Sequence, residues 1–182
     1  MGTVNLKTAS GGSVILSPAN TAVDVTITVP ASNATMLTTA TAGVPINGPC
    51  FSAWQSAVQT IPSATPTKVL FQTKDFDTNT CYDTTLSRFT PTVAGYYQII
   101  SSFNVPAASR ASEIQIYIYK NGGLWKSGND QTATTYNLQT TCLVYCNGST
   151  DYIETYVYIG IGATTVAYQV YTFFQAAMVR SA

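Results

Sequence analysis

The sequence contains no histidine. Histidine is the commonest general base at neutral pH, so a serine or cysteine nucleophile would lack its usual partner here. There is also no Gly-x-Ser-x-Gly motif, and of the eight acidic residues only Asp75, Asp77 and Asp83 cluster, around a predicted turn. Glycoside hydrolysis would need two carboxylates facing each other. We therefore predict a protein that is not an enzyme, with no catalytic residues and no cofactor.

Charge is scarce as well: only 9% of the residues are charged, eight basic and eight acidic, with no run of either sign. Nucleic-acid binding needs a basic patch that displaces counterions from phosphates, so that function is excluded. A typical soluble domain has about 25% charged residues. The deficit predicts that uncharged polar residues supply the surface, that other subunits cover much of it, or both.

Long apolar runs are missing too. No stretch approaches the roughly 18 apolar residues of a membrane span, which predicts no membrane insertion. The first residues, MGTVNLKTASGGSV, lack the apolar core of a secretory signal. We therefore expect synthesis in a cytoplasm.

The four cysteines, Cys50, Cys81, Cys142 and Cys146, include no Cys-x-x-Cys pair of the zinc-ribbon type. On one strand, Cys142 and Cys146 would lie about 13 Å apart. A disulfide tolerates about 7 Å between Cα atoms, so these two cannot pair unless the chain turns between them. We predict free thiols that pack as small apolar residues, and no metal site.

Asp75, Asp77 and Asn79 resemble the start of a calcium-binding loop. That loop also needs a glycine and a glutamate, where this chain has Thr80 and Leu86. The pattern therefore favours a turn in which the Asp77 side chain binds the backbone.

The sequence does contain the composition and the alternating pattern of β-strands. Val, Ile, Thr and Tyr are frequent, and they fit a pleated, half-buried surface. Tyr97, Ile99, Ser101 and Phe103 fall on one face of a strand at a period of two, and Ile114, Ile116 and Ile118 do the same. Many short strands without a helical period predict an all-β fold of two facing antiparallel sheets, a jelly-roll sandwich.

The spacing of six residues resembles the signature of the complement-1q-like globular domain, a family of tumour necrosis factor-like jelly rolls; they are Phe71, Asp77, Tyr82, Phe89, Gly95 and Tyr97. The signature continues with two aromatic residues where this chain has Ile99 and Ser101. Phe51-Ser-Ala and Lys120-Asn-Gly are similar to family segments as well. The resemblance covers about residues 51–179. It implies that the aromatic members of the six are core and strand-register residues and that Gly95 serves a turn.

Residues 1–47 differ from the rest. Two short apolar runs flank Gly11-Gly12 and predict a hairpin, and residues 22–29 alternate as a further strand. Such short strands cannot bury a core alone, so either three copies wind together as a stalk or the segment packs on the main domain as a meander. Residues 11–37 resemble segments of bacteriophage tail-fibre and other virion-fibre proteins. A linker-like stretch, 38–49, places the boundary near Gly48, which gives an N-terminal segment 1–47 and a head domain 48–182.

Five tyrosines are predicted on strand faces opposite the aliphatic ones: Tyr117, Tyr119, Tyr152, Tyr156 and Tyr158. Exposed aromatic patches usually mark an interface. We predict that these tyrosines line the seam of a homotrimer, the assembly that the family resemblance implies. The alternative is that both faces of these strands are partly core.

Together these patterns favour a non-enzymatic, trimeric virion fibre or tail-tip protein. The N-terminal segment would contact other virion proteins, and the head would bind a polysaccharide or protein receptor on a bacterial surface. The receptor loops we expect are 61–67, 104–112 and 126–136. Two alternatives stay open: an extracellular complement-1q/tumour necrosis factor-like recognition or signalling protein, and a purely structural capsid-decorating or spore-surface component.

Overall fold

The computed structural model describes residues 4–7, 13–16, 48–104, 113–132, 137–161, 163–164 and 169–182. The chain separates into two compact units, Met1–Met36 and Leu37–Ala182. The boundary near Gly48 stays a prediction. No helix among the described residues is long and apolar enough to cross a membrane.

The smaller unit contains strands β1 (Val4–Lys7) and β2 (Ser13–Leu16). They pair antiparallel, with Val4 opposite Leu16 and Lys7 opposite Ser13, as the predicted hairpin around Gly11-Gly12 requires. The further strand predicted over residues 22–29 lies outside the described residues.

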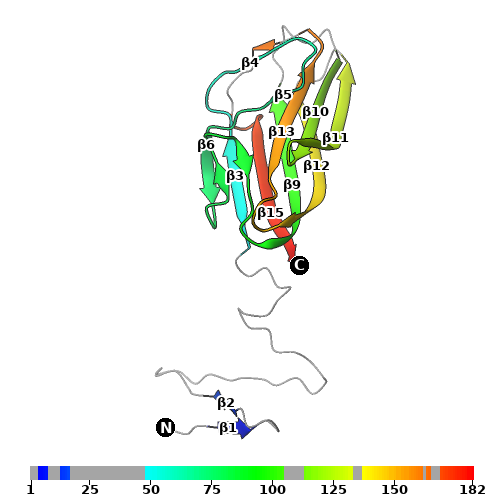
Figure 1. Ribbon diagram of the computed structural model, residues 1–182. Helices are drawn as coiled ribbons and strands as arrows, with labels where there is room; N and C mark the ends of the chain where they lie inside the picture. Colours follow the sequence, from blue (N-terminus) through cyan, green and yellow to red (C-terminus); the bar gives the residue numbers. More distant parts are fainter. Residues whose placement is uncertain are drawn as a thin grey trace. The chain divides into compact units, whose positions relative to one another are not determined.

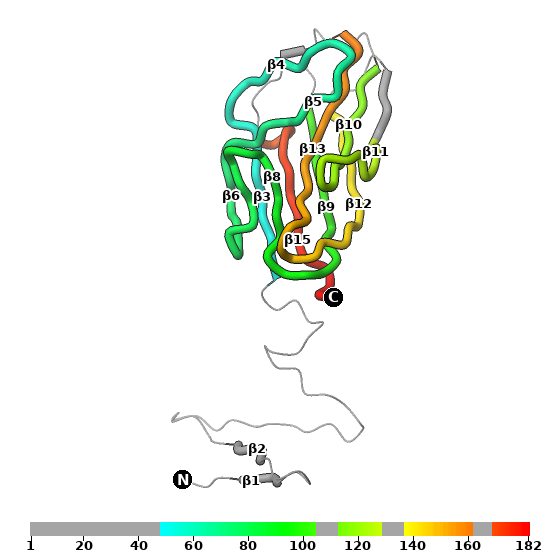
Figure 2. The backbone as a smooth tube through the Cα atoms, in the orientation of Figure 1, coloured from blue at the N-terminus to red at the C-terminus, as the bar shows by residue number. Residues whose placement is uncertain are grey.

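The larger unit contains two antiparallel sheets (Figures 1 and 2). The first, which we call sheet I, has the strand order β12-β9-β15-β3-β6. Its strands are β3 (Cys50–Trp54), β6 (Thr73–Asp77), β9 (Ala94–Asn104), β12 (Asn137–Asn147) and β15 (Phe173–Ser181). β15 lies between β9 and β3, the central place that the family resemblance implies for the closing strand.

The second, which we call sheet II, has the order β11-β10-β13-β8-β7, and β5 also pairs with β13. Its strands are β5 (Thr67–Lys68), β7 (Tyr82–Asp83), β8 (Arg88–Phe89), β10 (Glu113–Lys120), β11 (Gly123–Thr132) and β13 (Ile153–Ile159). Two short strands, β4 (Thr60–Ile61) and β14 (Ala163–Thr164), form a separate pair. The predicted all-β, two-sheet antiparallel architecture is confirmed.

The core lies between the two sheets and is rich in aromatic rings. Phe51 stacks on Tyr82 at 4.4 Å between ring centroids and meets Phe174 edge-on at 5.0 Å. Phe89 meets Tyr97 edge-on at 5.4 Å. Offset and edge-on pairs of this kind stabilise beyond the area they bury. The alternating residues of β9 and the isoleucines of β10 complete the core, as their period of two predicts.

Residues 67–77 do not form one continuous strand. The structure has two strands there, β5 in sheet II and β6 in sheet I, so the chain crosses from one sheet to the other between them. In the crossing, the Phe71 amide donates to Ser87 Oγ at 2.9 Å, and its carbonyl accepts from Tyr82 Oη at 3.1 Å. Side chains therefore satisfy backbone groups that a continuous strand would pair in a ladder.

The buried Ser101 stands where the family signature has an aromatic ring. Thr155 Oγ1 of sheet II donates to Ser101 Oγ at 3.0 Å, and Ser101 Oγ donates to the Phe173 carbonyl at 3.3 Å. A hydrogen bond between the sheets thus occupies this part of the core, which satisfies both buried hydroxyls.

Gly95 lies within β9 and does not serve a turn, which corrects the role implied for it. A Cβ atom at this position would lie 2.5 Å from the Arg180 carbonyl oxygen of β15. The glycine is needed because two backbones approach closely. The predicted loop 126–136 is also wrong in part, since β11 continues through Thr132 and pairs with Glu113 there.

Candidate interaction surface

The outward face of sheet I carries little charge away from its edge strand β6. β3, β9 and β12 contain no Asp, Glu, Lys or Arg, β15 contains one, Arg180, and β6 contains three, Lys74, Asp75 and Asp77. Because Tyr97 and Ile99 point into the core, the residues that alternate with them along β9, such as Tyr96 and Ile100, point outward. Six large apolar or aromatic side chains of this sheet are 37–58% exposed: Phe76, Tyr96, Ile100, Leu143, Tyr145 and Val179. We call this surface the sheet I face.

The strand register brings these side chains together. Tyr96 lies opposite Tyr145, with ring centroids 5.5 Å apart. A hollow of about 540 Å³ opens beside Tyr96 and Leu143. A second, of about 170 Å³, lies among Phe76, Ile100 and their neighbours. Adjacent apolar side chains and hollows are what a packed contact requires.

The carboxylate at the edge of the sheet I face is satisfied within the chain. Asp75 accepts hydrogen bonds from Ser52 Oγ at 2.8 Å and from Gln169 Nε2 at 2.6 Å. Ser52 in turn accepts one from Gln175 Nε2 at 3.1 Å. Both carboxylate oxygens of Asp75 therefore already accept a hydrogen bond within the chain.

The outward face of sheet II is different, and it holds the five tyrosines predicted for a trimer seam. All five are half-buried. Tyr119 stacks on Tyr156 at 4.1 Å with 20° between the ring planes, and Tyr117 meets Tyr119 edge-on at 6.4 Å. The Tyr117 hydroxyl donates to Gln115. The tyrosines thus lie on one face and contact each other; that they contact a second copy stays a prediction.

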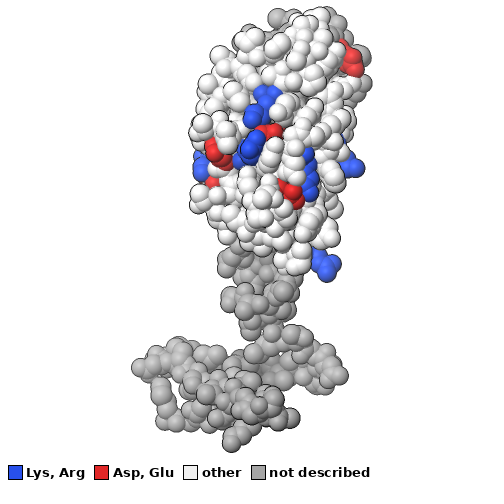
Figure 3. Space-filling model, viewed as in Figure 1, with Lys and Arg blue, Asp and Glu red and all other residues white. Residues whose placement is uncertain are grey.

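A buried carboxylate organises this same face. Figure 3 shows basic and acidic side chains close together on the face in view. The Glu154 side chain is 3% exposed, and its Oε1 atom lies 3.2 Å from Lys68 Nζ and 2.9 Å from Arg88 Nη2. The Arg88 guanidinium also lies 3.7 Å above the centre of the Tyr152 ring. Partial burial, followed by the nearby Glu154 charge, raises the pKa of Tyr156.

The residues of the family signature lie in the core or at its edge. Phe71, Tyr82, Phe89 and Tyr97 are each at most 4% exposed. The Asp77 carboxylate accepts hydrogen bonds from the amides of Cys81 at 2.9 Å and Tyr82 at 3.3 Å, the geometry of a turn. Partial burial raises the pKa of Asp77, but these bonds and one from Lys74 at 2.8 Å outweigh it and hold the pKa below its usual value.

All four cysteines are free thiols. Cys81 and Cys146 are buried, and burial raises the pKa of the Cys146 thiol to about 12. Burial also raises the pKa of Cys81, with a further contribution from its hydrogen bond to Asp77. Among the described residues, no group of three or more metal-ligating side chains could hold a metal ion.

The sheet I face was not among the surfaces predicted from the sequence, although its signal was present. Residues 94–104 and 137–147 are two eleven-residue stretches without a charge. Of the predicted receptor loops, residues 62–66 form an exposed connection between β4 and β5, although Ile61 is buried in the core. Residues 105–112 and 133–136 lie outside the described part.

No family model and no curated protein matches the sequence. Solved structures do match. The globular domain of zebrafish complement 1qA is 14% identical, with a TM-score of 0.55, over 74% of this chain and 99% of that one. Murine APRIL is 8% identical, with a TM-score of 0.55, over 72% and 98%. Eiger TNF from S. frugiperda is 8% identical, with a TM-score of 0.53, over 74% and 93%. At such identities the likeness shows the fold alone. It confirms the predicted fold, a complement-1q-like and tumour necrosis factor-like jelly-roll sandwich.

Proposed function

We propose that this protein is a non-enzymatic homotrimer that buries the sheet I face against further copies of the same chain. The observation that carries the proposal is the combination of exposed apolar side chains with charge-free strands β3, β9 and β12. Burying an unpaired charge is costly, so a surface without charges is suited to lasting contact.

A ring of three copies needs two different patches, because each copy contacts its neighbours head to tail. The sheet I face supplies one patch. Leu124 and Trp125 of the edge strand β11 are 58% and 43% exposed and supply a second apolar patch. We propose that this edge packs on the sheet I face of the next copy.

The mass in solution tests the assembly. We expect multi-angle light scattering to give about three times the chain mass of 19.4 kDa. A species of 19.4 kDa at all concentrations would contradict the trimer.

We further propose that the trimer is the head of a virion fibre and attaches to a bacterial surface. The support is the resemblance of residues 11–37 to virion-fibre segments, together with the separation of the chain into two compact units. In this proposal the N-terminal segment contacts other virion proteins, and three heads multiply weak contacts with a receptor.

Binding of the purified, labelled protein to whole bacterial cells tests attachment. We expect saturable binding to a subset of strains, and loss of binding after surface polysaccharide is stripped if the receptor is a glycan. Absence of binding to every strain, with the trimer intact, would favour the purely structural role.

A further inference from the structure

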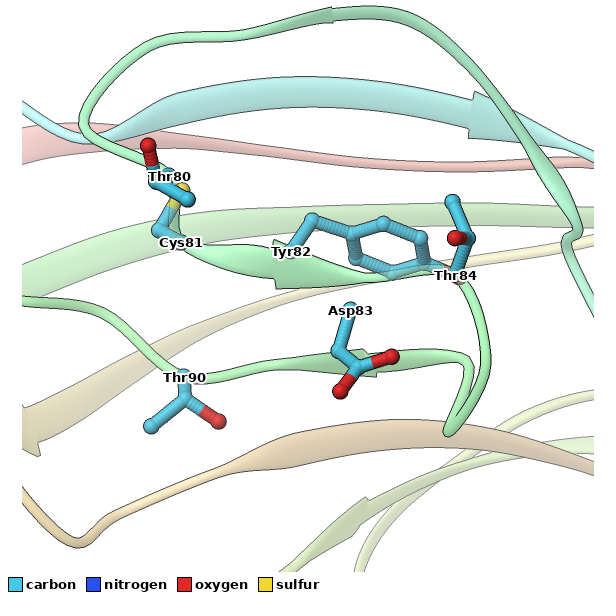
Figure 4. A pocket seen from close by; sticks show the side chains of 6 residues that line it. All are labelled: Thr80, Cys81, Tyr82, Asp83, Thr84 and Thr90. Atoms are coloured by element: carbon cyan, nitrogen blue, oxygen red, sulfur yellow. The ribbon is translucent and has the colours of Figure 1, made fainter.

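A polar hollow lies beside the β7–β8 hairpin, at the edge of sheet II where β7 is the outermost strand. Its volume is about 450 Å³, and it is lined by Thr80, Cys81, Tyr82, Asp83, Thr84 and Thr90 (Figure 4). In Figure 4 the side chains of Asp83 and Thr90 extend in the same direction.

The hollow presents polar atoms that the protein does not use. Within the described residues, the hydroxyls of Thr80, Thr84 and Thr90 make no hydrogen bond, and neither does the Oδ2 atom of Asp83. The other oxygen, Oδ1, accepts from the amides of Thr85 at 2.7 Å and Leu86 at 3.0 Å. The carboxylate is therefore held in place with one oxygen left for a ligand.

No cation neutralises this carboxylate. Arg88 is the cross-strand partner of Asp83, but its guanidinium contacts Glu154 and Tyr152 instead. None of the ion pairs of the described residues includes Asp83. The hollow thus offers a fixed negative acceptor, and three threonines are among the other residues that line it.

The backbone around the hollow is held in an uncommon conformation. Asn79 and Thr80 have φ angles of 69° and 50°, and Thr80 is β-branched, for which a positive φ is unfavourable. The Asp77 carboxylate binds the amides of Cys81 and Tyr82 and so fixes the turn. Strained backbone that its surroundings hold in place is typical of sites that are organised before a ligand binds.

We infer that this hollow binds a saccharide unit, with Asp83 Oδ2 accepting from sugar hydroxyls and the threonine hydroxyls completing the contacts. Hydrogen bonds to an ionised carboxylate are the stronger kind, and a sugar supplies several neutral donors. Protein partners favour exposed aromatic anchors, whereas here Tyr82 is only 4% exposed. A calcium ion takes about six to eight oxygen ligands, usually with several carboxylates, whereas Asp83 is the one carboxylate among the residues that line the hollow.

The inference rests on the proposed attachment only in taking the sugar to be part of a cell-surface polysaccharide. The test uses the full chain on an array of bacterial capsular and lipopolysaccharide glycans, followed by affinity measurement by biolayer interferometry on the best glycan. Asp83→Asn keeps an oxygen for Thr85 and Leu86 but removes the charge, and we expect about tenfold weaker binding. Thr90→Val, which removes one free hydroxyl, is expected to weaken binding about threefold.

The matched control is Thr60→Val, because Thr60 is exposed on β4, makes no side-chain hydrogen bond within the described residues and does not line the hollow. It should bind as the unchanged protein does, and all three variants should keep the same melting temperature. Equal affinity of Asp83→Asn and the unchanged protein would overturn the inference. So would the absence of any bound glycan, or calorimetric binding of calcium alone that Asp83→Asn abolishes.

Whole-cell binding separates this inference from the proposed attachment. Cells that bind Asp83→Asn as well as the unchanged protein would contradict the saccharide site and leave attachment standing. Glycan binding through the hollow without any cell binding would leave the site standing and contradict attachment.

Discussion

The outward faces of the two sheets differ in how their side chains are satisfied. On sheet II, charged and aromatic groups meet partners in the same chain: Glu154 binds Lys68 and Arg88, and Tyr119 stacks on Tyr156. On the sheet I face, large side chains such as Leu143 and Phe76 remain at least half exposed. A face whose charged and aromatic side chains are paired within the chain gains little from a partner. A face with a large exposed apolar area is stabilised when a partner covers it. We therefore place the proposed assembly surface on sheet I.

The largest expected effect is loss of the trimer when a charge enters the sheet I face. Leu143 is 58% exposed, and β3, β9 and β12 offer no cation to an aspartate placed there; Arg180 of β15 lines the same hollow. Burying an added carboxylate is costly even beside a cation, so Leu143→Asp should lower the mass in light scattering to 19.4 kDa.

The matched control is Tyr158→Asp on sheet II, which should leave the trimer mass unchanged. The reverse result, with a monomer for Tyr158→Asp and a trimer for Leu143→Asp, would support the tyrosine seam predicted from the sequence. It would contradict our assignment to sheet I.

The next largest effect concerns the charges of sheet II. Arg88→Met leaves the buried Glu154 carboxylate with Lys68 alone, so the free energy of unfolding in urea should fall by about 3 kcal/mol. Lys68→Met should cost less, about 1 kcal/mol, because Arg88 donates to the carboxylate from both Nε and Nη2. Adding Glu154→Gln to Arg88→Met should recover part of the loss, and a further loss would contradict this account.

Asp77 tests the connection between the sheets, since it ends β6 of sheet I and binds the backbone at β7 of sheet II. Its pKa is lower in the folded state, so its stabilisation is complete above the ordinary aspartate value of about 3.9 and is lost as the pH falls through the lower folded value. Asp77→Asn should lower stability at neutral pH by about 2 kcal/mol.

The same variant should also show a shallower loss of stability in acid. Urea unfolding measured at a series of acidic pH values checks both effects. An unchanged acid slope would mean that other carboxylates account for the pH dependence.

The smallest effect compares one tyrosine pair on each sheet. A double-mutant cycle with Tyr119→Leu and Tyr156→Leu should give a coupling of about 1 kcal/mol at any protein concentration. The cycle for Tyr96 and Tyr145 should vary with protein concentration, because we place that pair in the assembly contact. If neither coupling energy varied with protein concentration, both tyrosine pairs would lie outside the assembly contact.

Much of the fold followed from local pattern. The alternation of Tyr97, Ile99 and Ser101 predicted a strand with one buried face, and all three are buried. The crossing between β5 and β6 did not follow, because an extended segment looks the same in sequence whichever sheet it joins. The role of Gly95 was also hidden, since the Arg180 carbonyl it accommodates is 85 positions away in the chain.

The polar hollow shows the same limit. Asp83 was visible as one of three clustered acids, and Thr80 as the residue that stands where a calcium loop needs a glycine. That Asp83, Thr80 and Thr90 line one hollow depends on the pairing of β7 with β8, and that Asp83 has no cation partner depends on Arg88 contacting Glu154 instead.

The sequence by itself determined that this chain is an all-β sandwich with an aromatic core, because side-chain alternation and turn chemistry are local properties. It also determined that β3, β9 and β12 would carry no charge. Only the tertiary structure decided that these strands belong to one sheet and turn exposed side chains to one side. Strand order is set by long-range pairing, and no local pattern records which strands lie side by side.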